Sequence, residues 1–489
     1  MKTIFLYTTE GFSIRYLLKT DIFKVLSQSG HKIIILSDAE KQDTIRTQFG
    51  SATVVVKKVD SERFRRYLAS SRIQRILISF RAFVLNSRYD TETIDRFRTI
   101  FLEQAGWGRD ATVPKRIMGI LWRFFSWLFC YSRFLRNNLV RFEQLVFSPR
   151  FNKELYRSNP PDLVVVTSLC GFQFDEFIAR EALANRVPVC TIILSWDNTT
   201  GLGYRGYLPS KVIAWNETMK HELSTLNDIP VNSISVGGVA HFDHYFLDTP
   251  IENKKSLFKR LRLDPKKATL FFATKSPKRF PWGPALASKM LDAIDDGLIN
   301  REAQLLIRLH PLHFRRDHLG RLLFQDILDE YKQLEEERGN LSINWPNLAT
   351  TGIAFDLADN ETNLVKALLM HSDIMLNMFS TMIIEAAIFD LPAINICIQD
   401  EFRDPSGNSR KDLMIDYEQT HNQRLIATGA SVTAWSFKEL FLLINRYLDD
   451  PSTGRENRQQ IVDNEIGPHQ GCAGESIGRY LIDLVSPRP

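Results

Sequence analysis

Short apolar runs alternate with helix-like segments along this chain, and they form two separate series. In the first half, the runs lie at 3–8, 32–36, 162–167, 189–194, 212–215 and 233–236. The second half has runs at 268–273, 303–309, 374–379 and 393–396. Short apolar strands with helices between them are typical of parallel sheets covered on both faces. Since 489 residues also exceed one ordinary domain, the sequence predicts an α/β protein with two Rossmann-like domains.

The stretch 249–267 separates the two series, and it is polar and charged. We interpret it as a linker that includes a short helix. The first domain then spans 1–248, with a helical insertion at about 90–155, and the second domain spans 268–455.

The composition excludes some classes of protein. A formal charge of +5 is small for this length, so we expect no nucleic-acid partner. The five cysteines are scattered and form no CxxC pair, which favours a reduced, cytoplasmic setting over a disulfide framework. The first apolar run turns polar too early for a signal peptide, and no run reaches the ~18 residues of a membrane-spanning helix.

The segment 115–137 is dense in Trp and Phe and carries basic residues. At helical spacing, one narrow stripe holds Lys115, Gly119, Arg123, Ser126, Cys130, Arg133 and Asn137. The wide remainder is aromatic and aliphatic, although Arg136 also projects there. Such a helix suits a membrane interface with anionic lipid. A core helix or a dimer contact is the alternative.

Polar residues follow three apolar runs of the second half, at the point where each run ends. They are Lys275 and Ser276, then His310, and then Ser380 and Thr381. Ligands of open α/β sheets bind at these carboxyl ends, and a helix after Thr381 would offer free N–H groups to phosphate. Together the three tips predict a diphosphate site. Alternatively, the two hydroxyls only cap a helix, and His310 is an ordinary residue at a strand end.

Arg308 precedes His310 by two residues, so the two side chains lie on the same face of a strand. A metal site at His310, His313 and His318 is disfavoured, because no thiol or carboxylate set accompanies these histidines. We therefore expect neither a metal nor another cofactor.

Two carboxylates stand at strand ends of the first half, Glu10 and Asp197. Either one could serve as a general base for a hydroxyl nucleophile. Each could equally be a turn or capping acid. His241 and His244 follow a Gly-Gly turn at 237–238. No further metal-ligating residues accompany them, so we do not predict a metal site there.

Four segments of the chain resemble GT-B glycosyltransferases, in particular bacterial surface-polysaccharide enzymes that include CDP-glycerol glycerophosphotransferases and CMP-sugar transferases. These segments are IRLHP at 307–311, FSTMIIEAAIFDLPAI at 379–394, VGGVAHFDHYF at 236–246 and HQGCAGESIGRYLIDL at 469–484. The resemblance implies two domains facing a cleft, with the donor on the second and the acceptor on the first. It also implies a hinge near 237–248 and a closing helix, within 456–489, that packs back toward the first domain.

The resemblance assigns roles to individual residues. His310 would contact the donor phosphate and stabilise the leaving nucleotide. Ser380 and Thr381 would hold the diphosphate, and Glu385 would grip the ribose or the sugar.

The expected function is therefore that of a metal-independent glycosyltransferase in cell-surface polysaccharide biosynthesis. It would move a sugar from a nucleotide-sugar donor to a lipid-linked or glycan acceptor, in the cytoplasm or peripherally on the cytoplasmic face of the membrane. Three alternatives remain open: a polyol-phosphate transferase with a CDP-glycerol-type donor, a UDP-sugar 2-epimerase of the same fold, and a non-catalytic GT-B scaffold.

Overall fold

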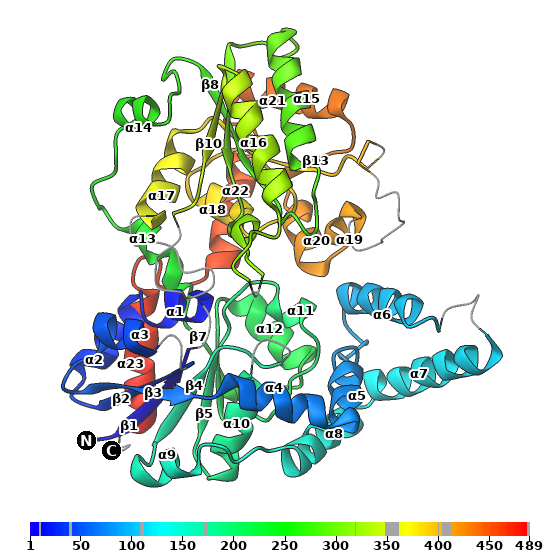
Figure 1. Cartoon of the computed structure of the whole chain (residues 1–489), viewed down its shortest axis with the longest axis vertical. Coiled ribbons are helices and arrows are strands. Elements are labelled where there is room, and N and C mark those ends of the chain that lie inside the picture. The colour runs from blue at the N-terminus through cyan, green and yellow to red at the C-terminus, as the bar shows by residue number, and fades with distance from the viewer. Residues whose placement is uncertain are drawn as a thin grey trace. The chain divides into compact units, whose positions relative to one another are not determined.

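The computed structural model of the chain divides into two compact units (Figure 1). It describes residues 1–8, 11–38, 42–107, 112–170, 174–317, 319–347, 361–399, 401–402 and 412–486. Of these, unit 1 holds the residues up to 246 together with 465–486, and unit 2 holds the residues from 247 to 464.

The described part of unit 1 is built on one seven-stranded parallel sheet of order β3-β2-β1-β4-β5-β6-β7. Its strands are β1 Thr3–Tyr7, β2 Lys32–Asp38, β3 Val54–Val59, β4 Leu163–Val166, β5 Val189–Ile192, β6 Lys211–Ala214 and β7 Ile234–Val236. β1 pairs with β2 on one side and with β4 on the other, so the strand order reverses between β1 and β4.

Helices of unit 1 connect and cover these strands. They are α1 Gly11–Leu17, α2 Asp21–Gln28, α3 Gln42–Phe49, α4 Ser61–Ser70, α5 Arg72–Arg81, α6 Glu92–Gln104, α7 Val113–Tyr131, α8 Arg133–Val146, α9 Lys153–Ser158, α10 Asp175–Ala184, α11 Asn198–Gly201, α12 Glu217–Thr225, α13 Asp243–Phe246 and α23 Ala473–Val485. The helices α4 to α9 are inserted between β3 and β4. No helix in the described ranges has both the length and the apolar character needed to cross a bilayer.

The described part of unit 2 repeats this plan with six parallel strands in the order β10-β9-β8-β11-β12-β13. The strands are β8 Ala268–Ala273, β9 Ala303–Arg308, β10 Leu341–Asn344, β11 Ile374–Asn377, β12 Ala393–Ile396 and β13 Ser431–Ala434. Here the order reverses between β8 and β11, which pair directly. In doubly wound sheets, the crevice outside such a reversal is where ligands bind.

Alternate residues of the inner strands β8, β9, β11 and β12 enter two different cores. In β8, Leu270 and Phe272 join the cluster formed with α15 Gly283–Asp295, α16 Gln325–Glu337 and α21 Phe437–Asp449. Phe271 and Ala273 join the opposite cluster, formed with α14 Lys254–Arg260, α17 Glu361–His371 and α18 Met382–Ile388. Both faces are therefore buried, which explains the continuously apolar runs. The remaining helices are α19 Leu413–Tyr417, α20 Thr420–Ala427 and α22 Arg455–Ile461.

The last helix, α23, packs against α2 within unit 1. Gly474 and Gly478 permit this contact, since a Cβ atom on Gly478 would lie 2.8 Å from the Cβ of Val25. The carboxylate of Asp243 accepts hydrogen bonds from the N–H groups of Ala473 and Gly474, at 3.0 and 2.7 Å. The start of α23 is thereby fixed to the 3-10 and helical turns that follow β7. The predicted fold class, two parallel α/β domains of the GT-B type, is confirmed.

Candidate functional site

The candidate site lies at the carboxyl edge of the sheet of unit 2, where the strand order reverses. Lys275 follows β8 by two residues, and Met378 follows β11 directly. The Nζ atom of Lys275 donates a hydrogen bond to the backbone oxygen of Met378 at 2.9 Å. One lysine therefore joins the tips of the two strands between which the order reverses.

A buried carboxylate accompanies this lysine. Asp416, from α19, accepts from Lys275 at 3.0 Å and from Arg279 at 2.9 Å. Burial lowers the pKa of Lys275, while the nearby Asp416 carboxylate acts in the opposite direction. The ion pair fixes the position of the ammonium, and the second cation, Arg279, keeps the cluster positive by one charge.

The backbone and ring of His310 are both fixed by hydrogen bonds. Its N–H donates to Oγ1 of Thr274 at 2.9 Å, which links the ends of β8 and β9. Its ring atom Nδ1 accepts the N–H of Leu312 at 3.1 Å. Because Nδ1 acts as an acceptor, a neutral His310 ring carries its proton on Nε2.

The environment of His310 keeps its ring neutral. Burial, and then the charges of His313, Lys275 and Arg308, lower the pKa of His310 to about 4. At neutral pH the group is therefore an uncharged Nε2–H donor. Such a group can donate a hydrogen bond to a phosphate oxygen without first losing or gaining a proton.

The turn after β11 adopts a constrained backbone. Phe379 has φ +54°, a left-handed conformation that is unusual for a bulky residue. Two asparagine side chains hold it: Oδ1 of Asn395 accepts from the N–H of Phe379 at 3.3 Å, and Oδ1 of Asn377 accepts from the N–H of Ser380 at 3.1 Å. The turn thus brings Ser380 to the same edge as Lys275.

Neither hydroxyl at positions 380 and 381 caps α18 in the described structure. The Oγ atom of Ser380 is buried and has no hydrogen-bond partner among the described residues, and the same holds for Nδ2 of Asn377. Thr381 directly precedes α18 without a side-chain capping bond. Glu385 lies in the first turn of α18 and is buried. A buried hydroxyl that lacks a partner is costly in the free protein, and it would gain a hydrogen bond from a ligand oxygen.

Two other predicted residues belong to the same edge. Arg308, at the end of β9, is buried and donates to Asn344 and, at 2.9 Å, to Glu361. Its guanidinium therefore already has protein partners. Ser276 is half-buried, and its backbone oxygen accepts from the N–H groups of Arg279 and Phe280.

The predicted general bases belong to unit 1. Asp197 follows β5 and stands just before α11, and its backbone oxygen accepts from the N–H of Gly201 at 2.8 Å. Its half-buried carboxylate makes no capping bond to α11. Glu10 lies outside the described residues. Both roles stay predictions.

The histidines show no metal-like arrangement in the part of the chain that the structure describes, where no group of three or more His, Cys, Asp or Glu could hold an ion. His313 Nδ1 contacts the backbone oxygen of His310 at 2.9 Å, and His318 lies outside the described residues. His241 is buried among the rings of Tyr16, Trp215 and Phe242.

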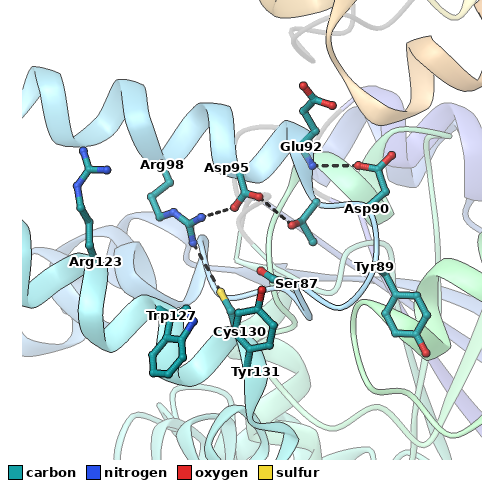
Figure 2. Close-up of a pocket in the computed structure, with 11 residues that line it drawn as sticks. Ser87, Tyr89, Asp90, Glu92, Asp95, Arg98, Arg123, Trp127, Cys130 and Tyr131 are labelled. Atoms are coloured by element: carbon teal, nitrogen blue, oxygen red, sulfur yellow. Dashed lines mark hydrogen bonds and ion pairs between the residues drawn. The ribbon is translucent and has the colours of Figure 1, made fainter.

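Unit 1 contains a separate pocket of about 670 Å³ beside α6 and α7 (Figure 2). Glu92, Asp95 and Arg98 line it from α6, Asp90 lies just before that helix, and Arg123, Trp127 and Tyr131 line it from α7. Asp95 pairs with Arg98, which also contacts Cys130 Sγ at 3.6 Å. With three carboxylates against two guanidinium groups, the lining has no excess positive charge with which to bind a diphosphate.

Sequence reasoning missed the residues that support the edge of unit 2. Asn377 and Asn395 lie within strands that otherwise read as apolar, and a buried asparagine in such a run is the signal that could have found them. Asp416 gives no such signal, because it reaches Arg279 across 137 positions of sequence.

Comparison with known proteins shows the fold. The sequence matches no protein-family model and no curated protein. Among solved structures, the chain is similar to a complex of S. aureus MnaA with UDP, with a TM-score of 0.53 and 12% identity over 100% of this chain and 99% of that one. It is also similar to the UDP-GlcNAc 2-epimerase of Neisseria meningitidis bound to UDP-GlcNAc, with a TM-score of 0.50 and 11% identity over 99% and 100%.

A glycosyltransferase from Rickettsia africae matches with a TM-score of 0.47 and 12% identity, over 99% of this chain and 97% of that one. At identities this low, the matches with TM-scores of 0.53 and 0.50 show a shared fold alone. What the chain binds must be argued from its own residues.

Proposed function

We propose that this chain is an enzyme that acts on a nucleotide sugar and binds the diphosphate at the carboxyl edge of unit 2. The observation that carries the proposal is the unpaired, buried hydroxyl of Ser380. It belongs to the same edge as the ammonium of Lys275 and the neutral imidazole of His310. A cation and two hydrogen-bond donors are the groups that a diphosphate requires.

The reaction that we propose is glycosyl transfer. An acceptor hydroxyl attacks the anomeric carbon, the bond from that carbon to the phosphate oxygen breaks, and the nucleotide leaves with the electron pair. His310 donates its Nε2–H to an oxygen of the leaving phosphate, and Lys275 balances the developing charge. Asp197 or Glu10 takes the proton of the acceptor.

The inserted helices support transfer to a lipid-linked acceptor in cell-surface polysaccharide biosynthesis. α7 exposes large apolar side chains that include Phe124 and Trp127. A water-soluble nucleotide sugar does not need an exposed apolar surface for its binding, whereas an acceptor with a lipid tail does. The enzyme would then work in the cytoplasm, at the inner face of the membrane.

A 2-epimerase is the second candidate, and one specific observation favours it. The N. meningitidis structure, which is bound to UDP-GlcNAc, matches over nearly the whole of both chains. An epimerase would convert its nucleotide sugar without any acceptor, and this difference can be measured.

Nucleotide binding is the first test. The melting temperature should be measured with UDP, GDP, CDP and CMP, for the natural protein, for Lys275→Met and for the surface control Lys438→Met. We expect one nucleotide to raise the melting temperature of the natural protein and of the control, and to have little effect on Lys275→Met. No rise with any nucleotide would contradict the proposal and favour a scaffold.

The second test separates the reactions. The protein is incubated with sugars on the nucleotide that binds, with and without an acceptor lipid, and the products are followed by NMR. Turnover that needs the acceptor supports the transferase. A change at C2 of the sugar without acceptor establishes the epimerase instead.

A further inference from the structure

Helix α7 turns its small residues toward the protein. Gly119, Ser126 and Cys130 are its buried residues, and a Cβ atom on Gly119 would lie 2.4 Å from the backbone oxygen of Trp107. Cys130 Sγ lies 3.5 Å from the backbone oxygen of Phe83. The small residues of the narrow stripe therefore mark the attached side of this helix.

Two aromatic residues complete the attachment of α7 to unit 1. Trp122 packs against Phe80, Phe101 and Trp107, with ring centroids 5.3 to 5.7 Å apart. Phe129 packs edge-on against Phe80 at 5.1 Å. α7 is thus held in a defined orientation, and the side that it presents outward is fixed.

The outward side of α7 is apolar. Phe124 is 53% exposed and Trp127 is 57% exposed. The other exposed apolar residues of α7 are Val113, Ile117, Met118, Ile120, Leu121, Phe125, Leu128 and Tyr131. In Figure 1, α7 lies at the side of unit 1 that is remote from its sheet. We call this set of exposed residues the α7 face. A contiguous exposed apolar surface of this kind marks a binding site.

The charge carried by α7 and by the part of α8 up to residue 142 has one sign only. Between residues 112 and 142 the chain has no Asp or Glu, and its exposed basic residues are Lys115, Arg116, Arg123, Arg133 and Arg141. Arg136 does not belong to this face, because it is buried and pairs with Asp228 at 2.8 Å. The carboxylates of Asp90, Glu92 and Asp95 adjoin the face at one edge only, beside Trp127 and Tyr131, and Arg98 pairs with Asp95 there. The occupant of the α7 face should therefore be apolar and should present negative charge to the basic residues of α7 and α8.

We propose that the α7 face docks into the interface of an anionic lipid bilayer, with α7 lying parallel to the membrane plane. The aromatic side chains would enter the boundary between headgroups and acyl chains, and the basic residues would contact the lipid phosphates. The exposed basic residues beside the aromatic ones agree with a helix that lies in the interface.

A second copy of the chain fits this face less well. In a two-fold dimer the same patch faces itself, so the basic residues of one copy would meet those of the other. Like charges placed opposite each other disfavour association. Anionic lipid removes this repulsion and supplies the complementary charge. The inference rests on the α7 face alone and is independent of the reaction at unit 2.

The test is co-sedimentation of the full chain with vesicles of phosphatidylcholine alone or with a quarter phosphatidylglycerol. We expect binding to the anionic vesicles that weakens as salt is raised. Phe124→Ser with Trp127→Ser should reduce the binding about tenfold or more, and Arg116→Glu with Arg123→Glu should reduce it similarly at low salt.

Leu442→Ser is the matched control, since Leu442 is 61% exposed on α21 of unit 2, and it should leave the binding unchanged. Circular dichroism and melting temperatures verify that each variant is folded. Absence of binding to anionic vesicles, or binding that both α7 variants retain, would overturn the proposal. The proposal would also be overturned if light scattering showed that the natural protein is a dimer and that the variant with Phe124→Ser and Trp127→Ser is a monomer.

Discussion

Nδ1 of His310 lies 3.1 Å from the backbone nitrogen of Leu312 and accepts its hydrogen bond. This local contact decides the chemistry of the whole ring, because it places the proton of the neutral imidazole on Nε2. The proline at 311 favours the extended exit from β9 that makes the contact geometrically accessible. A two-residue turn thus converts an ordinary histidine into a fixed, uncharged donor.

Two substitutions can separate the two nitrogens of His310. Asparagine retains an acceptor near the Nδ1 position but lacks the distal donor, whereas glutamine can place a donor near Nε2 and loses the local acceptor. We expect His310→Asn to keep the melting temperature and to lower turnover by roughly 10²–10³, the usual effect of removing one donor to developing charge. His310→Gln should retain more activity. Equal turnover for His310→Asn and the natural protein would remove the ring from the mechanism.

The stability of unit 2 should fall as the pH is lowered through the window set by His310. Its pKa is about 4 in the folded protein against an ordinary value of 6.5, so between these values the unfolded chain binds more protons. Stability therefore rises with pH in this window, and it is lost as the pH falls from 6.5 toward 4.

The measurement is the melting temperature against pH for the natural protein and for His310→Gln, in which the slope should be shallower. His313 adds a term of the same sign, and Asp243, whose pKa is raised to about 6, adds one of opposite sign. The contributions of His313 and Asp243 are present in both proteins, so they cancel when the melting temperature of His310→Gln is subtracted from that of the natural protein at each pH. Parallel curves would show that burial does not hold His310 neutral.

The strands that could be predicted from sequence have neighbours on both sides, with the exception of the edge strand β7. β1, β8 and β11 are buried on both faces and read as apolar runs. Three edge strands of the sheets, β3, β10 and β13, were not predicted. β3 carries two lysines, and β10 and β13 have only four residues each, with polar side chains among them. An edge strand is stabilised by pairing with one neighbour, and this leaves little trace in a local pattern.

The candidate site divides in the same way. Lys275, His310 and Ser380 could be found because each follows an apolar run. The unpaired state of the Ser380 hydroxyl and the contact from Lys275 to Met378 depend on how β8 and β11 lie side by side, which no local pattern contains. For α7, the periodicity placed small and basic residues together on one narrow stripe. It could not indicate that the small residues Gly119, Ser126 and Cys130 are buried against the protein while the basic residues of the stripe are exposed.

Replacing Ser380 should affect the free and the ligand-bound protein differently. In the free protein the buried Oγ has no partner, so Ser380→Ala removes an unsatisfied group and should leave the melting temperature equal or slightly raised. With the nucleotide bound, the variant lacks one hydrogen bond and should bind up to roughly tenfold more weakly, which corresponds to about 0.5–1.5 kcal/mol. Titration calorimetry measures the affinity. A destabilised free protein with unchanged affinity would show that the hydroxyl has a structural role instead.

The inserted helices depend on a buried ion network, and this gives the largest expected effect on stability. Glu143 of α8 accepts from Arg81 at 2.9 Å and from Arg180 at 2.6 Å, and all three side chains are at most 1% exposed. The network joins α8 to α5 and α10.

Replacing Glu143 with Gln keeps the volume of the side chain and leaves two buried guanidinium groups with only one carboxylate, that of Glu176. Breaking a buried pair from one side costs about 3–5 kcal/mol, so the free energy of unfolding from urea titration should fall by this amount. Glu154→Gln is the matched control, since Glu154 pairs with Arg157 on the surface with 85% of its side chain exposed, and we expect no measurable change there. If Glu143→Gln were as stable as the control, the attachment of α8, and with it the fixed orientation of α7, would have to come from the Arg136–Asp228 pair and the apolar contacts.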